Sequence, residues 1–285
     1  MINAALVLEG GALRGVFSAG VTDVLIEKGM EFSYVNGVSA GSMCAMNYVA
    51  KQAGRMFRVN AEYLHDKRYM NLNPRHVMQT REVFSFDFLF GELSDKLIPF
   101  DKERFEASPQ VFEVVATRCR TGMPEYFEKS TCSDIYQAVM ASSSMPAFSK
   151  MVKLDGKEYL DGGISMPIAY GRAMELGYDK VVLILTREQG YRKKPESPMK
   201  KRAFDRYFGP LPELREALRE IPERYNRMQE EIDRLESEGR IFVIRPEKHV
   251  TVSRTERDIK KLGALYEEGR QVAGKRMEAL LSYLG

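Results

Sequence analysis

Cysteine, histidine and long apolar runs are scarce in this sequence of 285 residues. The three cysteines, Cys44, Cys119 and Cys132, are too few and too widely spaced for a disulfide framework or a zinc site, so we expect no bound metal. No run of about 18 apolar residues occurs, which argues against a membrane-spanning helix. The first residues lack a basic segment, so we expect no secretory signal and a cytoplasmic location.

Net charge of one sign is also small. Lys and Arg together number 43, against 40 Asp and Glu, which leaves a formal charge of +3. Because this balance provides no extended positive field, the composition argues against a dedicated nucleic-acid-binding protein. Apolar residues make up 44% of the chain, which is enough for a continuous core, so a folded protein is expected.

The order of apolar patterns indicates the fold class. A short apolar run at 4–9 ends at two glycines, and a segment with helical spacing follows at 14–28. The alternation repeats with a strand at 32–38 and a helix at 40–53. Further strands are expected at 112–117, 125–128, 181–186 and 241–244, with a hairpin at 153–160. This order predicts an α/β fold, a three-layer sandwich with a mostly parallel central sheet and helices on both faces.

Composition changes after Arg187, and we divide the chain there. Residues 4–187 are expected to form the catalytic α/β core, and residues 188–285 a mostly helical extension packed on the same domain. The amphipathic pattern at 214–235 contains Pro222, which removes a backbone donor and crowds the preceding turn. Two helices, or one kinked helix, are therefore expected there.

Residues 191–202 form a basic stretch interrupted by two prolines. A solvated loop is the commoner explanation for such a stretch. The alternative is a patch that makes transient contact with anionic lipid headgroups, which would place the protein at the periphery of a membrane.

The segment Gly37-Val38-Ser39-Ala40-Gly41 fits the pattern G-x-S-x-G between a predicted strand and a predicted helix. A serine on such a sharp turn has its hydroxyl exposed above the sheet, and glycines give the backbone room to turn. The N-terminus of the following helix favours developing negative charge at the same place. This context favours a nucleophile at Ser39 over a purely structural turn.

A second glycine turn follows the first strand, at residues 9–15. A dinucleotide fingerprint would need glycine where the chain has Ala12. The alternative is an anion-binding turn in which the amides of Gly10, Gly11 and Ala12 stabilise an oxyanion. Two such turns at neighbouring strand ends would converge on one place, so we prefer the oxyanion interpretation.

A serine nucleophile needs a base. The order Ser39, Asp161, His249 would suit a triad, but Ser39 follows only the second predicted strand, earlier than in that architecture. Asp161 alone, in a tight turn before Gly162 and Gly163, is the other candidate. A carboxylate with a pKa of about 3.9 is a weak base, so its surroundings would have to strengthen it.

Together, the turn at 10–15, the serine motif at 37–41 and Asp161-Gly162-Gly163 resemble the three motifs of bacterial patatin-like phospholipases. The segment 138–169 is similar to the region that leads into their aspartate, and the resemblance extends over about residues 4–187. The motif residues that support the turns are Arg14, Gly15, Gly37, Gly41, Gly162 and Gly163. The chain departs from the commonest pattern at Ala12, where a positive φ would strain alanine although its N–H survives.

This resemblance implies a patatin-like fold and a serine acyl-ester hydrolase with a Ser39–Asp161 dyad. It implies an oxyanion hole at Gly10, Gly11 and Ala12, lipid or other acyl esters as substrates, and no cofactor. Arg14 would hold the turn or a lipid phosphate. A His249 triad and a non-catalytic lipid- or nucleotide-binding module remain as alternatives.

Some other residues have weaker signals. Apolar side chains from 56 to 90 could line an acyl groove, although core packing explains them about as well. They are Met56, Phe57, Tyr63, Met70, Met78, Phe84, Phe86, Phe88 and Phe90. Ser142 to Ser144 are expected to end a helix, and Cys44 to fill a small buried space.

Overall fold

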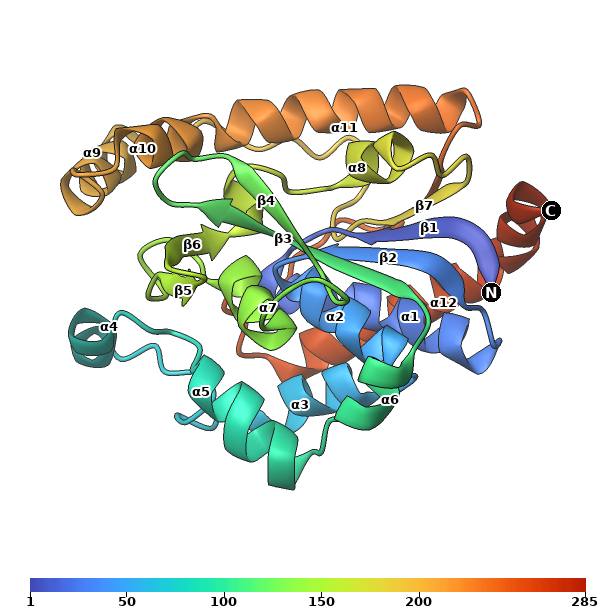
Figure 1. Ribbon diagram of the computed structural model, residues 1–285, viewed down its shortest axis with the longest axis horizontal. Helices are drawn as coiled ribbons and strands as arrows, with labels where there is room; N and C mark the ends of the chain where they lie inside the picture. The colour runs from blue at the N-terminus through green and yellow to red at the C-terminus, as the bar shows by residue number, and fades with distance from the viewer.

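An eight-stranded sheet crosses the middle of the molecule (Figure 1). The structure is a computed structural model, and it describes residues 1–285 except for the side chain of Lys200. The strand order is β5-β6-β3-β2-β1-β7-β8, and β4 also pairs with β3. The strands are β1 Ile2–Leu8, β2 Phe32–Val38, β3 Val111–Arg118, β4 Pro124–Glu128, β5 Val152–Leu154, β6 Lys157–Asp161, β7 Val181–Ile184 and β8 Phe242–Ile244.

Helices connect most of these strands. The α-helices are α1 Val16–Glu27, α2 Ala40–Val49, α3 Arg55–Tyr63, α4 Pro74–Thr80, α5 Phe86–Phe88, α6 Lys102–Ala107, α7 Ile135–Ser143, α8 Tyr170–Glu175, α9 Pro198–Tyr207, α10 Pro212–Arg219, α11 Ile221–Ser237 and α12 Ile259–Leu284. There are also two short 3-10 helices, η1 Ala12–Gly15 and η3 Gly162–Ile164, and one π-helix, η2 Leu89–Leu97. Predicted strand and helix ends differ from these bounds by a few residues, since helix ends fray and turns overlap them.

The sheet is buried on both faces, as the apolar strands require. On β1, Leu6 and Leu8 join the core that includes α1, α2 and α12, whereas Ala5 and Val7 join the core of α8 and α11. Figure 1 shows α8 and α11 on one side of the sheet and α1, α2 and α12 on the other. The predicted three-layer α/β sandwich is therefore confirmed.

The sheet is mostly parallel at its centre. Strand β1 pairs in parallel with β2 and β7, β2 with β3, and β7 with β8, while β3, β4, β5 and β6 pair antiparallel. The expected hairpin at 153–160 is confirmed, and both residues of its turn, Asp155 and Gly156, have positive φ. Positive φ at both positions suits a two-residue hairpin turn.

The C-terminal part adds to the same layers. Helix α10 ends at Arg219 and α11 begins at Ile221, so the expected interruption near Pro222 is confirmed. Pro222 lies in the first turn of α11, where a backbone N–H would have no acceptor within the helix, so proline loses no hydrogen bond there. Helix α12 packs on α1 so closely that a Cβ at Gly20 would overlap the Tyr266 carbonyl and one at Gly269 the Phe17 carbonyl.

The solvated-loop interpretation of residues 191–202 fits the exposed, irregular residues Lys194, Pro195 and Ser197, but not the residues on either side of them. The Lys193 backbone exchanges two hydrogen bonds with the Asn226 side chain of α11, at 2.8 and 3.0 Å, and Arg192 pairs with Asp233 at 3.3 Å. From Pro198 onward the chain is helical, while the Lys200 side chain lies outside the described part. Arg192 and Lys193 thus pack on α11, because Asn226 bonds to the Lys193 backbone and Asp233 pairs with the Arg192 charge.

No helix in the described part of the chain has a stretch that is long and apolar enough to cross a bilayer.

Candidate active site

Ser39 lies on the sharp turn between β2 and α2. Its φ of 56° and ψ of −128° are a conformation that residues with a side chain rarely adopt. The flanking glycines allow the turn to pack tightly, because a Cβ on Gly41 would lie 2.6 Å from the Leu8 carbonyl oxygen, and one on Gly37 2.5 Å from that of Gly41. This is the strained strand-to-helix geometry that projects a serine hydroxyl above a sheet.

Strand β3 brings Asp161 to this turn. Val38, which ends β2, pairs with Val115, and Asp161, which ends β6, pairs with Ala116, the next residue of β3. The hydroxyl of Ser39 donates a hydrogen bond to Oδ2 of Asp161 at 2.7 Å. Both residues are only 7% exposed, so the pair is shielded from water.

The surroundings of Asp161 change its basicity. Burial raises the pKa of Asp161 above its ordinary value, and hydrogen bonds from Ser39 and from the Gly163 amide act in the opposite direction. The Gly163 amide donates to Oδ1 at 2.7 Å, which orients the carboxylate. Gly162 permits the close approach, since a Cβ there would overlap the Val115 carbonyl oxygen. A buried carboxylate with a raised pKa is a stronger base than an exposed one.

The first glycine turn lies beside Ser39. A Cβ on Gly10 would lie 2.9 Å from the Ser39 Cβ, so only glycine fits without displacement. Ala12 has a φ of 50°, the positive value that strains alanine by about 1–2 kcal/mol. Within the described chain, the amides of Gly11 and Ala12 donate no hydrogen bond to a protein acceptor. Free amides on a strained turn can bind an anion.

Arg14 and Gly15 complete this turn. Arg14 is 7% exposed, and its Nε has no partner among the described residues. Burial and the cations of Arg187 and Arg254 lower the pKa of Arg14 to about 10. Gly15 packs on α2, where a Cβ would lie 3.0 Å from that of Ala40.

One residue at the site was missed as a functional candidate. Helix α7 ends at Ser143, as expected, but Ser142 Oγ also accepts a hydrogen bond from the Ser39 amide at 2.9 Å. This bond fixes the strained turn from a segment more than 100 residues away in sequence. Serine is ordinary at helix ends, so no sequence signal separates this role from a simple helix terminus.

The histidines are engaged elsewhere. Nδ1 of His249 lies 2.6 Å from Glu188, and Nδ1 of His65 lies 3.1 Å from the Arg257 guanidinium. His76 is on the exposed helix α4. In the described part of the chain, no histidine lines either of the two cavities that Ser39 borders.

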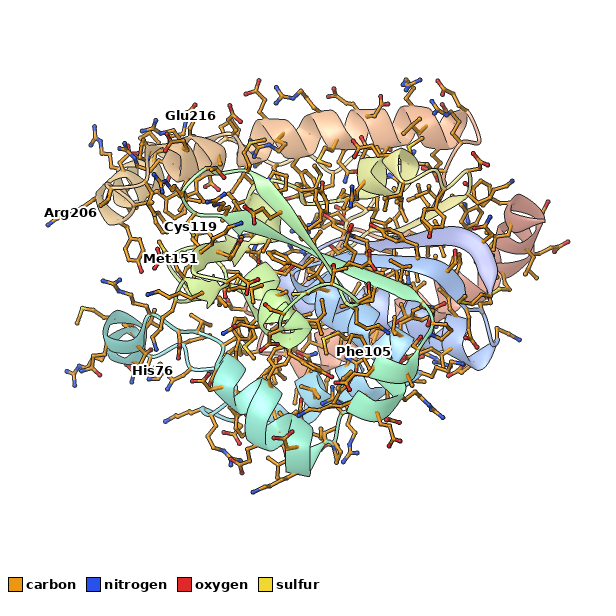
Figure 2. The ribbon with its side chains drawn as sticks, in the orientation of Figure 1. His76, Phe105, Cys119, Met151, Arg206 and Glu216 are labelled. Atoms are coloured by element: carbon orange, nitrogen blue, oxygen red, sulfur yellow. The ribbon has the colours of Figure 1, made fainter. Side chains whose placement is uncertain are left out.

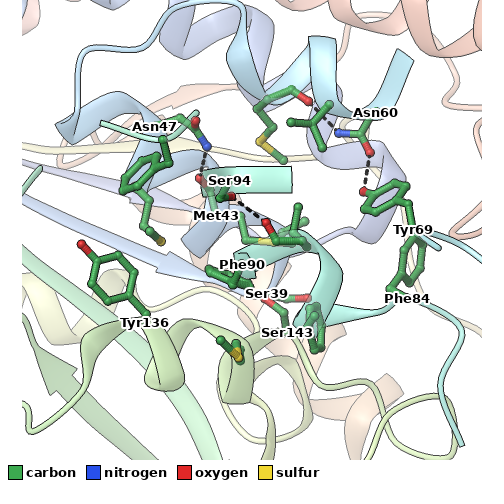
Figure 3. A pocket seen from close by; sticks show the side chains of 18 of the residues that line it. Ser39, Met43, Asn47, Asn60, Tyr69, Phe84, Phe90, Ser94, Tyr136 and Ser143 are labelled. Carbon is green, nitrogen blue, oxygen red and sulfur yellow. Dashed lines mark hydrogen bonds between the residues drawn. The ribbon is translucent and has the colours of Figure 1, made fainter. Parts of the chain in front are cut away.

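The first cavity, of about 230 Å³, is mainly apolar (Figure 3). Figure 3 shows Met43, Phe90 and Tyr136 around Ser39 at this cavity. Its polar lining groups bond to one another: Arg55 donates to Asn47 at 3.1 Å and to Ser94 at 2.9 Å. The cavity therefore offers an apolar space that ends at the serine.

The expected acyl groove is formed by only some of the proposed residues. Met56, Phe84, Phe86 and Phe90 line the cavity. The others are elsewhere: Phe57 stacks on Tyr266, Tyr63 packs against Phe88, Met70 is 2% exposed and Met78 is 78% exposed. Residues outside the 56–90 segment, among them Met43, Met46, Phe100 and Met140, complete the lining.

The second cavity, of about 440 Å³, also borders Ser39 and is more polar than the first. Its walls include Glu9, Gly10, Gly11, Ala12 and Arg14 of the glycine turn, together with Asp161 and residues of the C-terminal part. Among the described residues, no group of three or more His, Cys, Asp and Glu side chains is placed to hold a metal ion. Cys44 is buried against Thr22 at 3.3 Å, as expected of a small core residue.

The fold and this site define a class: α/β sandwich proteins with a strained serine at the end of a central parallel strand, beside a turn with free amides. The chain belongs to the patatin-like phospholipase family, whose sequence model, described as "Patatin-like phospholipase", matches residues 6–172. A second match, to the "Domain of unknown function (DUF6363)", spans residues 211–285.

Two individual proteins are similar to parts of this chain. The uncharacterized protein YjjU of Escherichia coli is 30% identical over 187 residues, covering 64% of this chain and 51% of the relative. The probable lipid hydrolase 463L of Invertebrate iridescent virus 6 is 28% identical over 174 residues, covering 56% and 59%. The chain thus matches between half and three fifths of each relative's length.

A solved structure shares the fold. VipD from Legionella pneumophila superposes with a TM-score of 0.51 over 99% of this chain and 67% of VipD, at 14% sequence identity. At that identity the likeness concerns the fold alone.

Proposed function

We propose that this protein is a serine acyl-ester hydrolase that cleaves lipid acyl esters with a Ser39–Asp161 dyad. The observation that supports it most directly is the hydrogen bond of 2.7 Å from the Ser39 hydroxyl to the buried Asp161 carboxylate. A hydroxyl becomes a nucleophile when an adjacent base accepts its proton. Family membership independently favours lipid esters as substrates.

In the proposed reaction, Ser39 Oγ attacks the ester carbonyl carbon while Asp161 accepts the hydroxyl proton. The free amides of Gly11 and Ala12, with Gly10 beside them, stabilise the negative carbonyl oxygen. As the intermediate collapses, Asp161 returns the proton to the departing alcohol, which leaves an acyl group on Ser39. A water molecule then gives its proton to Asp161 and attacks the acyl carbon. As the fatty acid leaves, Asp161 passes that proton to Ser39 Oγ, which restores the serine.

The apolar cavity is the proposed site of the acyl chain. It begins at Ser39 and continues between Met43, Phe90 and Met140, where aliphatic carbons would be removed from water. Burial of apolar area stabilises binding by about 25 cal/mol per Å².

The triad alternative predicts a different result for His249. We expect His249→Ala to retain ester hydrolysis within about twofold of the native rate, because this side chain is 76% exposed and bonds to Glu188. Replacement of a triad histidine, by contrast, lowers the catalytic rate by several orders of magnitude. Steady-state kinetics on a p-nitrophenyl ester would decide, and a loss of a hundredfold or more would favour the triad.

We propose that residues 4–187 form the catalytic core and that residues 188–285 extend the same domain. Two contacts between the parts support a single domain: β8 pairs with β7 within the common sheet, and α12 packs on α1. A cytoplasmic location at the periphery of a membrane stays a prediction.

For the membrane contact we propose a surface that is wider than residues 191–202, and we call it the docking rim. It consists of Met78 on α4, Phe148, and Met199 and Tyr207 on α9, which are 78%, 47%, 80% and 38% exposed. The Arg81 guanidinium lies 5.0 Å from the Tyr207 ring centre, which joins the two helices. Figure 2 shows His76 of α4 and Arg206 of α9 at the same end of the molecule.

Basic residues accompany the rim. Lys201, Arg202 and Arg206 are exposed on α9 beside its apolar side chains. Cations near exposed apolar groups favour an anionic lipid surface by about 1 kcal/mol each.

We expect the double variant Met78→Ser, Met199→Ser to hydrolyse lipid in anionic vesicles at least about tenfold more slowly, relative to its rate on a water-soluble ester. Each apolar side chain removed from the bilayer costs about 1.5 kcal/mol or more. Leu281→Ser is the matched control, since Leu281 is 55% exposed on α12, away from the rim. An unchanged ratio of the two rates in the double variant would contradict the docking rim.

A further inference from the structure

The second cavity beside Ser39 has an unusual charge composition. Basic side chains from four separate segments line it: Arg14 of η1, Arg187 after β7, Lys193 and Lys194 before α9, and Arg254 between β8 and α12. The only carboxylates among its described lining residues are Glu9, Asp161 and Glu196. The cavity wall therefore carries an excess of positive charge, although the chain as a whole is nearly neutral.

The positive charges are not neutralised by ion pairs. Among the described residues, no ion pair within 4.0 Å joins a carboxylate to Arg14, Lys193 or Arg254, although Glu9 raises the pKa of Arg14 and Lys193 against the larger effect of burial. Glu9 accepts hydrogen bonds from the Thr186 amide at 2.6 Å and from the Tyr225 hydroxyl at 2.9 Å, so it compensates these cations through the electrostatic field and not through a direct contact. Arg187 donates to the Val250 carbonyl, which carries no net charge.

The cations also repel one another. Burial and the charge of Arg254 lower the pKa of Lys193 to about 7. The ammonium of Lys193 lies 4.0 Å from the Tyr225 ring centre, a contact that holds the side chain in place. Arg14 is buried, with an Nε that no described residue satisfies. A buried charge that Glu9 compensates only in part is costly unless an anion binds it.

The location fixes which part of a substrate would meet these cations. Ser39, Ala12 and Met145 border both cavities, and the remaining lining residues belong to one cavity or the other. An ester whose acyl chain fills the apolar cavity therefore directs its alcohol part into the basic cavity.

We propose that the basic cavity binds a phosphate carried by the alcohol part of the ester, so that the enzyme selects anionic phospholipids or lysophospholipids over neutral esters. This proposal rests on the proposed hydrolase function and specifies its substrate class. The C-terminal part contributes Arg254 and the Tyr225 ring beneath Lys193, which gives residues 211–285 a role in headgroup selection.

Three esters of one medium-chain fatty acid test the proposal: a monoacylglycerol phosphate, the neutral monoacylglycerol and the cationic acylcholine. We expect the native protein to have a kcat/KM at least about tenfold higher for the phosphate ester than for the neutral ester. Arg254→Gln, a change at an exposed side chain, should lower this ratio about tenfold, the size of one charge-assisted hydrogen bond.

A second variant keeps the test independent of Arg254. Lys193→Glu should reverse the preference, so that acylcholine becomes a better substrate than the phosphate ester. Arg240→Gln, which removes an exposed cation after α11 outside both cavities and the docking rim, is the matched control and should keep the native ratio. Equal kcat/KM for the phosphate and neutral esters in the native protein, or a ratio that both cavity variants leave unchanged, would overturn the proposal.

Inhibition separates a headgroup from free phosphate. Glycerol phosphate should inhibit hydrolysis of the neutral ester more strongly than inorganic phosphate does. Equal inhibition by the two would overturn the headgroup assignment. If the native protein hydrolyses none of the three esters, the proposed hydrolase function itself fails, which is distinguishable from hydrolysis without charge preference.

Discussion

Asp161→Asn should lose at least about three orders of magnitude in kcat for a p-nitrophenyl ester, and Ser39→Ala should lose as much. Asparagine has nearly the shape of aspartate and can still accept the Ser39 hydrogen bond, but it cannot take up the proton. The double variant should be no slower than either single variant, because residues that act as one unit contribute non-additively. Initial rates with each purified protein provide the measurement.

Asp179→Asn is the matched control for this prediction. Asp179 is exposed before β7, outside both cavities, so the same chemical change there should leave the rate unaltered. Retention of more than a tenth of the native rate in Asp161→Asn would show that another group accepts the serine proton.

Gly162→Ala should destabilise the fold by about 3 kcal/mol and abolish hydrolysis. The added Cβ would overlap the Val115 carbonyl oxygen of β3 and lie 3.1 Å from Val38, so the chain after Asp161 would have to move. Because Val115 and Ala116 hold the strand ends that carry Ser39 and Asp161, that movement would separate the pair. Thermal unfolding and ester kinetics would measure the two effects.

The matched control is Gly171→Ala. Gly171 lies in α8, and a Cβ there would meet no atom within 4 Å, so alanine should leave activity unchanged and raise stability by about 0.5–1 kcal/mol. Equal stability of the Gly162→Ala variant and the native protein would contradict the packing described here.

The sequence predicts much of the fold because the relevant signals are local. The glycines before and after Ser39 mark a tight turn, and the apolar run at 181–184 marks a buried strand. The strain expected at Ala12 is also local, and its φ of 50° agrees with it. Each of these features depends on residues that are neighbours in the chain.

What could not be predicted depends on contacts between distant segments. The hydrogen bond from Ser39 to Asp161 joins residues 122 positions apart, and it exists because β3 pairs with both strand ends. Ser142 reaches the Ser39 amide only because α7 ends beside the turn. Lys193, which seemed part of a solvated loop, faces the site because Asn226 of α11 holds its backbone.

The most direct test of the central claim is to identify the acylated residue by mass spectrometry. The native protein would be quenched during turnover of a p-nitrophenyl ester, digested and mapped. The account predicts an acyl group on Ser39, and no adduct in Ser39→Ala. An acyl group on a different residue, or product release that continues undiminished in Ser39→Ala, would contradict it.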